Sequence, residues 1–410
     1  MDARLNVRFF FVPLVITVFI AASCSGEQGP EVAIASVKVS QATPLETSEL
    51  FESLTYVPLE TRSDAIIQEI TKVLVGEDIL VLFENFQLKR TFFVFDKKGR
   101  LLAKISDPGQ GPGRFTAASD VLMDWKTGTL EILDKYQSKV IFYDISGTLQ
   151  GDAFLPYNFE EFVKLDSDAY VFSAGNAIFD DTMPDELFWV SNFDRVDRSA
   201  LPIPEEVRNM SFSQYAFASS KYDDSYLFRR FFDSHIYRVD SRGATPVLEV
   251  DFGDQWIGEE VVRKFAMSRP GEKLRLLNEL EVVYNLKVAE EFDRFFLLAY
   301  FFDQRLFLTL VDKTTFHTLS YYQQYQSNRT NSIDGGVLPF FPIARHGKQL
   351  VFVHQAYELV EHAADHPQKI EGAFKEVIEG LKPEDNPVLI FAQLKEEQQL
   401  VETIHRKMNK

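Results

Sequence analysis

Several stretches of the chain are apolar at almost every position. The stretches are residues 92–95, 140–143, 306–311 and 388–392. A strand with one face in water should alternate apolar and polar side chains, so a continuous run indicates a strand that is covered on both faces. The blades of a β-propeller are packed between neighbouring blades, which covers their inner strands in this way. A lipocalin-like barrel or a two-sheet sandwich would leave one face of most strands polar.

The strand pattern recurs with a nearly constant period. An apolar strand that ends in Asp and is followed by a turn occurs at Asp96, Asp144, Asp194 and Asp240, at intervals of 48, 50 and 46 residues. A period of about 40 to 50 residues is typical of one propeller blade. Because Asp at the start of a turn bonds nearby backbone amides, we expect these carboxylates to be structural.

Two longer gaps in the later part of the chain contain helical patterns. Residues 257–281 predict two helical pieces that are separated at Pro270-Gly271, and residues 367–381 predict another helix. Without these inserts six units remain, so we predict an all-β, six-bladed β-propeller over residues 51–400. The last helix has an apolar stripe at Ile370, Phe374, Val377, Ile378 and Leu381.

The two ends of the predicted propeller should share one blade. Residues 54–60 contain Pro58, which a sheet tolerates at its edge. We therefore predict that this stretch is the outer strand of the last blade, whose inner strands come from the C-terminal part of the chain.

Residues 1–23 have the pattern of a signal peptide. Arg4 and Arg8 precede an apolar run over residues 9–22, which is shorter than the roughly 20 residues that a membrane-spanning helix needs. The sequence Ala-Ala-Ser-Cys that follows resembles a bacterial lipobox, which implies lipidation of Cys24. Cys24 is the only cysteine of the chain, so an intramolecular disulfide is impossible. We expect residues 24–50 to be a lipidated tether.

The residues after Cys24 bear on the location of the protein. Ser25, in place of Asp, resembles the pattern that releases lipoproteins to the outer membrane, and Glu27 resembles an acidic signal for surface export. We expect a lipid-anchored protein of the bacterial outer membrane, with orientation toward the periplasm or the cell surface left open. The net charge of −18 opposes binding to nucleic acid or to anionic lipid by the domain itself.

Six short motifs resemble one family over residues 51–395. The chain is similar to the six-bladed β-propeller lipoproteins of Bacteroidetes, which are related to NHL-repeat propellers. The resemblance implies the fold and supplies no catalytic residues, and the later blades lack the Gly-rich loops of the regular NHL pattern. The motifs are Tyr-Val-Pro-Leu-Glu-Thr at 56–61, Phe-Asp-Lys-Lys-Gly at 95–99, Gly-Gln-Gly-Pro-Gly-Arg-Phe at 109–115, Ile-Tyr-Arg-Val-Asp at 236–240, Ile-Asp-Gly-Gly at 333–336 and Asp-Asn-Pro-Val-Leu-Ile at 385–390.

Two segments are candidates for ligand binding. Asn331 and Asp334 follow the aromatic segment with Tyr322 and Tyr325, and together they offer hydrogen-bonding groups beside aromatic faces, as pockets for polar ligands do. The alternative is a structured loop with an Asp-Gly turn. Arg229 and Arg230 form a cationic pair that is unusual in an acidic protein, and their alternative role is ion pairing with carboxylates.

Other motifs fall short of a catalytic site. His362 and His366 have the spacing of a metal pair, but Pro367 should keep them off a common helix face, so that His366 or Asp365 caps the following helix. The Gly-rich stretch at 109–113 lacks the Lys-Ser/Thr of a phosphate loop, and no Gly-x-Ser-x-Gly motif occurs. We assign no metal ligand, no cofactor and no catalytic residue.

The function hypothesis follows from the absence of a recognisable catalytic constellation. We favour a non-catalytic binding module for a protein, peptide or glycan partner. The alternative is a metal-dependent hydrolase or lyase, with Ca²⁺ or Zn²⁺ held by carboxylates and amides at the propeller axis.

Overall fold

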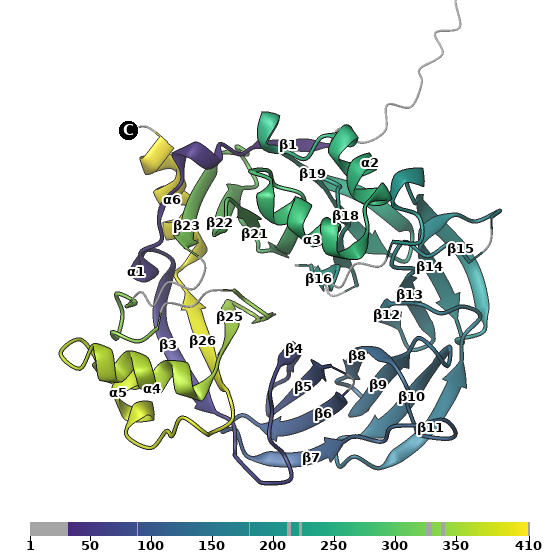
Figure 1. Ribbon diagram of the computed structural model, residues 1–410, viewed down its shortest axis with the longest axis horizontal. Helices are drawn as coiled ribbons and strands as arrows, with labels where there is room; N and C mark the ends of the chain where they lie inside the picture. The colour runs from purple at the N-terminus through teal and green to yellow at the C-terminus, as the bar shows by residue number, and fades with distance from the viewer. Residues whose placement is uncertain are drawn as a thin grey trace, which may run out of the picture. The chain divides into compact units, whose positions relative to one another are not determined.

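The computed structural model describes residues 32–408 except 88, 180, 211–214, 221–223, 325–329 and 338–340. Cys24, the expected signal peptide and Tyr325 lie outside the described residues. From Ala33 onward the chain forms one compact unit. Six β-sheets are arranged in a ring in this unit (Figure 1), which confirms the predicted six-bladed propeller.

Blades 1 to 3 are four-stranded antiparallel sheets built from consecutive strands. Blade 1 contains β4 (Ile70–Val75), β5 (Ile79–Phe86), β6 (Lys89–Asp96) and β7 (Leu101–Ile105). Blade 2 contains β8 (Ala118–Asp124), β9 (Thr129–Asp134), β10 (Lys139–Asp144) and β11 (Leu149–Phe154). Blade 3 contains β12 (Glu161–Asp166), β13 (Ala169–Ser173), β14 (Asp185–Ser191) and β15 (Arg195–Pro202), followed by the short helix η2 (Glu205–Val207).

Blades 4 to 6 add strands or helices to this plan. Blade 4 contains β16 (Phe217–Ser219), β17 (Tyr226–Arg229), β18 (His235–Asp240) and β19 (Gly243–Asp251). Blade 5 contains β20 (Leu286–Glu291), β21 (Phe295–Phe302), β22 (Arg305–Asp312) and β23 (Thr318–Gln324). Blade 6 contains β24 (Ala344–His346), β25 (Gln349–His354), β26 (Val388–Leu394) and β3 (Phe51–Pro58).

The continuous apolar strands are covered on both faces, as predicted. Phe92 and Val94 of β6 pack into a buried cluster with blade 2, whereas Phe93 and Phe95 pack into a cluster with blade 6. Each further pair of neighbouring blades encloses such a cluster. Alternate side chains of one strand therefore belong to two interfaces, and hydrophobic burial on both sides holds each blade in place.

Three of the four turn aspartates act on the backbone, as the sequence predicts, whereas Asp194 lies within the turn after β14 (Asp185–Ser191) and does not end a strand. The Oδ1 atom of Asp96 accepts the amide of Lys98 at 2.9 Å. Asp144 accepts the amide of Ser146 at 2.9 Å in the same way, and Asp240 accepts the amide of Arg242 at 2.7 Å. These carboxylates end the third strands of their blades and stabilise the turns that follow.

Ring closure by the two ends of the chain is confirmed. Strand β3, from the N-terminal part of the domain, pairs antiparallel with β26 from the C-terminal part, and Tyr56 lies opposite Ile390. Gly99 of blade 1 has φ +80° and lies so close to the carbonyl of Pro58 that a Cβ atom would clash with it. The closing blade is thus held by a hydrogen-bonded sheet and by close packing against its neighbour.

The expected tether over residues 24–50 is wrong from Ala33 onward. Strand β1 (Ala33–Ser36) pairs in parallel with β19, and β2 (Thr43–Pro44) pairs in parallel with β23. Ala35, Val37 and Leu45 are buried, so this segment covers the outer edges of blades 4 and 5. The helices η1 (Val39–Gln41) and α1 (Thr47–Leu50) complete the segment.

The predicted helical inserts are present, together with longer helices in blade 6 and after it that the sequence pattern did not predict. The insert after blade 4 contains η3 (Gly253–Gln255), α2 (Glu259–Met267) and α3 (Pro270–Glu279). The break between α2 and α3 lies next to Pro270, where it was expected. The helix predicted over residues 367–381 is shorter, because α5 covers only Gly372–Ile378. Phe374 of this helix packs against Leu359 of α4, and Ile370 and Leu381 of the predicted stripe join the cluster from outside the helix. The longer unpredicted helices are α4 (Ala356–Asp365) and α6 (Glu397–Met408). Within the described residues, none of the helices has the length and apolar character to cross a membrane.

Candidate functional site: a pocket between blades 3 and 4

A cavity of about 800 Å³ lies where blades 3 and 4 meet the helical insert. We call it the blade 3–4 pocket. Its walls come from four separate segments, namely the loop after β13, the η2 segment, the β17–β18 loop and the start of α2. Its volume lies within the roughly 300 to 1,000 Å³ of typical small-molecule sites. The pocket exists only because the ring brings these four segments together.

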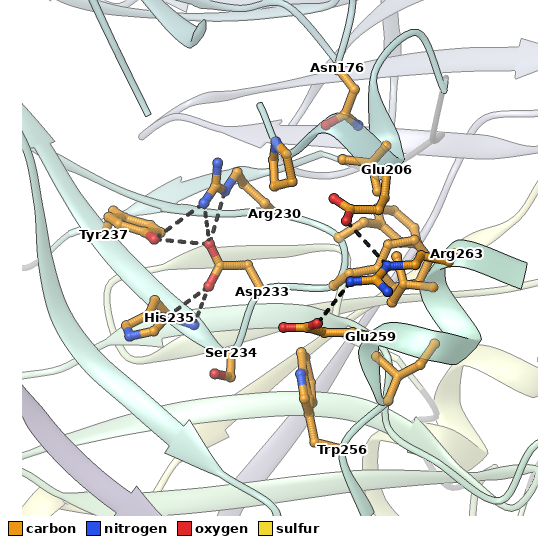
Figure 2. Close-up of a pocket in the computed structure, with 16 residues that line it drawn as sticks. Asn176, Glu206, Arg230, Asp233, Ser234, His235, Tyr237, Trp256, Glu259 and Arg263 are labelled. Carbon is orange, nitrogen blue, oxygen red and sulfur yellow. Dashed lines mark hydrogen bonds and ion pairs between the residues drawn. The ribbon is translucent and has the colours of Figure 1, made fainter. Parts of the chain in front are cut away.

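The β17–β18 loop forms the polar side of the pocket around one carboxylate (Figure 2). Asp233 accepts hydrogen bonds from the Arg230 guanidinium at 2.7 and 2.9 Å and from the Tyr237 hydroxyl at 2.9 Å. Its other oxygen lies 2.9 Å from Nδ1 of His235 and also accepts the His235 backbone amide. Arg230 further donates to the carbonyl of Pro202, which joins the loop to the end of blade 3. The network holds four side chains in one arrangement.

Charge and burial in this network shift the pKa values of its members. Burial alone would raise the pKa of Asp233, but hydrogen bonds from His235 and the charge of Arg230 outweigh it and hold this pKa well below its usual range. The hydrogen bond to Asp233 raises the pKa of His235 above its ordinary value. Burial, followed by the charge of Asp233, raises the pKa of Tyr237 to about 12. The network therefore favours a charged carboxylate and a protonated imidazole.

Trp256 supplies an aromatic wall. It stacks on Phe252, with ring centroids 5.7 Å apart and planes at 11°, and its backbone bridges to Val283. Ile257 continues this anchoring, since its amide donates to the carbonyl of Val283 at 2.9 Å. Among the described residues, the indole N–H of Trp256 has no hydrogen-bond partner. A rigid aromatic face with an available donor is therefore present at the pocket.

A second charged group lies at the mouth of the pocket, opposite the Asp233 network (Figure 2). Arg263 of α2 lies 3.3 Å from Glu259 of the same helix and 3.5 Å from Glu206 of η2. The three side chains are at least partly exposed, so their ion pairs contribute little to stability. A ligand could therefore replace these weak ion pairs with contacts of its own.

The backbone of the pocket wall is strained at Phe232. This residue has φ +59°, a left-handed conformation that is rare for a bulky side chain. Its ring packs at 5.4 Å against Phe265 of α2, and its amide donates to the carbonyl of Tyr284. Asn176 on the opposite wall is also left-handed, with φ +64°. Residues in such conformations cluster at functional sites, because only a constraining surrounding structure maintains them.

The two candidate arginines point to different places. Arg230 lines the blade 3–4 pocket and pairs with Asp233, as the alternative of ion pairing anticipated. Arg229 is buried and lines a second cavity at the propeller axis. Arg229 is the last residue of β17, whereas Arg230 is the first residue of the loop that follows.

The other candidate residues are not brought together with the arginines. Asn331 and Asp334 are both buried, and the Asn331 side-chain amide donates to Asp334 at 2.8 Å. Asp334 also accepts from the Tyr56 hydroxyl and from the amide of Gly336. Tyr322 lies on β23, next to β2, and packs against Phe307. This geometry favours the structured-loop alternative for Asn331 and Asp334 and a sheet position for Tyr322.

The expectation about the histidine pair was wrong. His362 and His366 lie one turn apart at the end of α4, and their rings stack with centroids 4.5 Å apart. The helix extends to Asp365 and His366 is its C-terminal cap, so Pro367 comes after the helix end instead of before a helix start. His362 is held by the carbonyl of Gly335 at 3.1 Å. Within the described part of the chain, no group of three or more His, Cys, Asp and Glu residues is arranged to hold a metal ion.

Sequence reasoning found one pocket residue, Arg230, and missed its partners. Asp233, His235 and Tyr237 follow it within a few positions, and the alternation of polar residues after Arg230 could have suggested one site. Trp256 and Arg263 lie in the insert, and no local pattern connects them to Arg230 because the connection is made by the ring.

The fold and this site define a six-bladed β-propeller with a ligand-sized pocket between two blades. The chain belongs to the family described as a domain of unknown function, DUF4934, whose model matches residues 31–393.

Two solved structures are similar to this chain. One is a protein of Bacteroides fragilis that is described as exported. It is 18% identical, with 89% of this chain and 100% of that chain covered and a TM-score of 0.72. The other is a member of the DUF4221 family from Bacteroides vulgatus, which is 10% identical, with 84% and 97% covered and a TM-score of 0.51. At these identities the likeness shows the fold alone. Comparison with curated proteins gives no match.

Proposed function

We propose that the protein is an exported, lipid-anchored binding module that holds a short oligosaccharide in the blade 3–4 pocket. The observation that supports this most directly is the cavity of about 800 Å³, which combines an aromatic wall with both donors and acceptors. A sugar ring has an apolar face and hydroxyls that donate and accept. Trp256 suits the ring face, whereas Glu206 and Arg263 suit the hydroxyls.

Other partner classes fit this pocket less well. A folded protein partner needs an extended contact area of about 800 Å² on each side, in place of a concave cavity. Addition of a strand to an open sheet edge is one common way to bind an extended peptide. The pocket is formed by loops, by η2 and α2, and by the start of β18, which is not an edge strand of its sheet, so the pocket offers no such edge.

The sequence supports the lipid anchor and a relation to NHL-repeat propellers. Cys24 follows Ala-Ala-Ser at the end of an apolar run, and the similar Bacteroides fragilis protein is described as exported. Two or more acyl chains would hold the protein firmly to a bilayer. The relation to NHL-repeat propellers is supported by the blade period and the Asp-Gly turns.

No observation favours the metal-dependent enzyme. Two carboxylates on the inner strands that the structure describes are engaged with cations, namely Asp120 with Lys72 at 2.5 Å and Glu290 with Arg345 at 3.0 Å. Such pairs leave these carboxylates committed to the protein.

The test is a binding titration with a panel of di-, tri- and tetrasaccharides. The full-length protein should be used in a detergent without a sugar headgroup. We expect at least one panel member to bind and Trp256→Ala to weaken it tenfold or more, which corresponds to about 1.4 kcal/mol. Trp125→Ala is the matched control, because Trp125 is exposed and lies on a turn of blade 2. Equal loss in both variants, or no binding by the wild type at millimolar concentration, would contradict the proposal.

A further inference from the structure

A second cavity, of about 230 Å³, lies at the propeller axis. We call it the axial cavity. Its walls come from the innermost strands of blades 1, 4, 5 and 6, which contribute Thr71, Phe217, Lys287 and Ala344. It is separate from the blade 3–4 pocket in its lining and too small for an oligosaccharide, so it has no part in the function proposed above.

Arg229 brings a buried positive charge to this cavity, and among the described residues no carboxylate is in ion-pair contact with it. Its side chain is 6% exposed and donates to the carbonyls of Leu286 at 2.7 Å and Ala216 at 3.1 Å. It also donates to the carbonyls of Tyr215 and Lys287. Burial lowers its pKa to about 10, so the guanidinium remains charged at neutral pH. The carbonyls satisfy its N–H groups and leave its net charge in place.

Lys287 adds a second cation beside it. Its ammonium lies 5.2 Å from the ring centroid of Phe231. Among the described residues, Lys287 has no carboxylate within ion-pair distance. Burial, followed by the charge of Arg229, lowers its pKa to about 8, so most of the ammonium groups are still protonated at neutral pH.

The carboxylates Glu161 and Glu290, whose charges act on Arg229, have other partners in direct contact. Glu290 is paired with Arg345, and Asp120 is paired with Lys72. Glu161 accepts the amide of Ala216 at 2.8 Å, and burial raises its pKa to about 8, so it is largely uncharged at neutral pH. Among the described residues, the axial cavity therefore has two cations without a carboxylate in ion-pair contact, although the charges of Glu161 and Glu290 act on Arg229. The net charge of the protein is −18. Buried charges of this kind are stable when an opposite charge meets them.

The remaining wall is apolar. Phe217, Phe341, Pro342 and Ile343 line the cavity beside Lys287. From these two observations we infer that the axial cavity binds a small carboxylate with an apolar body, whose carboxylate lies against Lys287 and whose body packs on the phenylalanine rings. A phosphate ion would meet the charges but would leave the apolar wall unused.

The test compares three probes on the full-length protein by calorimetric titration. Benzoate has both the charge and the apolar ring, benzyl alcohol has the ring without the charge, and inorganic phosphate has the charge without the ring. We expect benzoate to bind at least tenfold more tightly than either of the other probes. Equal affinities, or no benzoate binding at millimolar concentration, would overturn the inference.

Variants locate the site. Lys287→Met keeps the length of the side chain and should weaken benzoate binding tenfold or more, whereas Lys287→Arg should retain most of it. Lys97→Met is the matched control, because Lys97 is also partly buried and its ammonium lies 5.5 Å from the ring centroid of Phe391. It should bind benzoate like the wild type. Unchanged benzoate binding by a folded Lys287→Met variant would refute the site.

Benzoate affinity of the wild type should also depend on pH. Between pH 7 and 9 it should fall about tenfold, because Lys287 loses its proton and Glu161 becomes charged over the same range. Both changes make the cavity more negative. An affinity that stays constant over this range would contradict the assigned role of Lys287. The other charged or titratable groups around the cavity are Arg229, Glu290, Arg345 and Tyr215.

Discussion

Replacement of Ile390 by alanine should destabilise the protein by 2 to 5 kcal/mol, the usual cost of such a truncation in a core. Ile390 lies at the centre of β26, opposite Phe352 of β25 and Tyr56 of β3, and its side chain is 0% exposed. It belongs to the buried cluster between blades 5 and 6. The substitution therefore removes packing from the blade that closes the ring.

The free energy that Ile390→Ala is expected to remove is a large part of the total free energy of unfolding. The free energy of unfolding of a domain is about 5 to 15 kcal/mol. In the closing blade, β3 is far from the other three strands in the sequence, so that only non-covalent contacts hold it to them directly. A cavity in this blade weakens an interface with a neighbouring blade as well as the blade itself. The sheet is too rigid to collapse onto the space left by three carbon atoms.

Urea denaturation with linear extrapolation measures the effect directly. Ile34→Ala is the control, since Ile34 is 56% exposed on β1 and its loss should cost less than about 1 kcal/mol. If both variants lose the same free energy of unfolding, β26 is not the buried, ring-closing strand that the fold requires.

Three further predictions concern the anchor, the pocket and metal. Cys24→Ser should move the protein from the detergent phase to the aqueous phase, and identical partitioning of variant and wild type would exclude the lipid anchor. The raised pKa of His235 should stabilise the fold fully below about pH 6.5, and this stabilisation should be lost as the pH rises through the pKa of His235 in the folded protein. In Asp233→Asn, NMR titration should show the pKa of His235 returning toward 6.5. EDTA should leave the melting temperature unchanged, whereas an occupied metal site at thousandfold excess would be worth about 4 kcal/mol and its removal would cause a clear drop.

Much of the fold was predictable because each blade repeats the same physical constraints. Strands covered on both faces must be apolar throughout, and a tight turn after the third strand favours Asp and Gly. Pro58 marked an edge strand, which placed the N-terminal strand in the last blade. These signals are local, and they recur at the blade period.

The segment at 33–50 was missed because its burial depends on the rest of the ring. Val37 and Val39 alternate with polar residues. Such a short alternating stretch is compatible with an edge strand and with a linker. Only the presence of β19 and β23 beside it decides between the two.

The candidate site was predictable only in part for the same reason. Arg230 was conspicuous as a cation in an acidic chain, but Trp256 and Glu206 come from other loops. Asn331 and Asp334 have the composition of a binding loop, yet they form hydrogen bonds with each other in a turn. The same residue types serve both purposes.

A crystal structure of the protein grown with the tightest oligosaccharide of the panel tests the central claim most directly. A sugar ring should lie against the face of Trp256, with its hydroxyls within hydrogen-bond distance of Glu206, Arg263 or the Asp233 network. An oligosaccharide that is bound elsewhere on the propeller, with the blade 3–4 pocket empty, would contradict it.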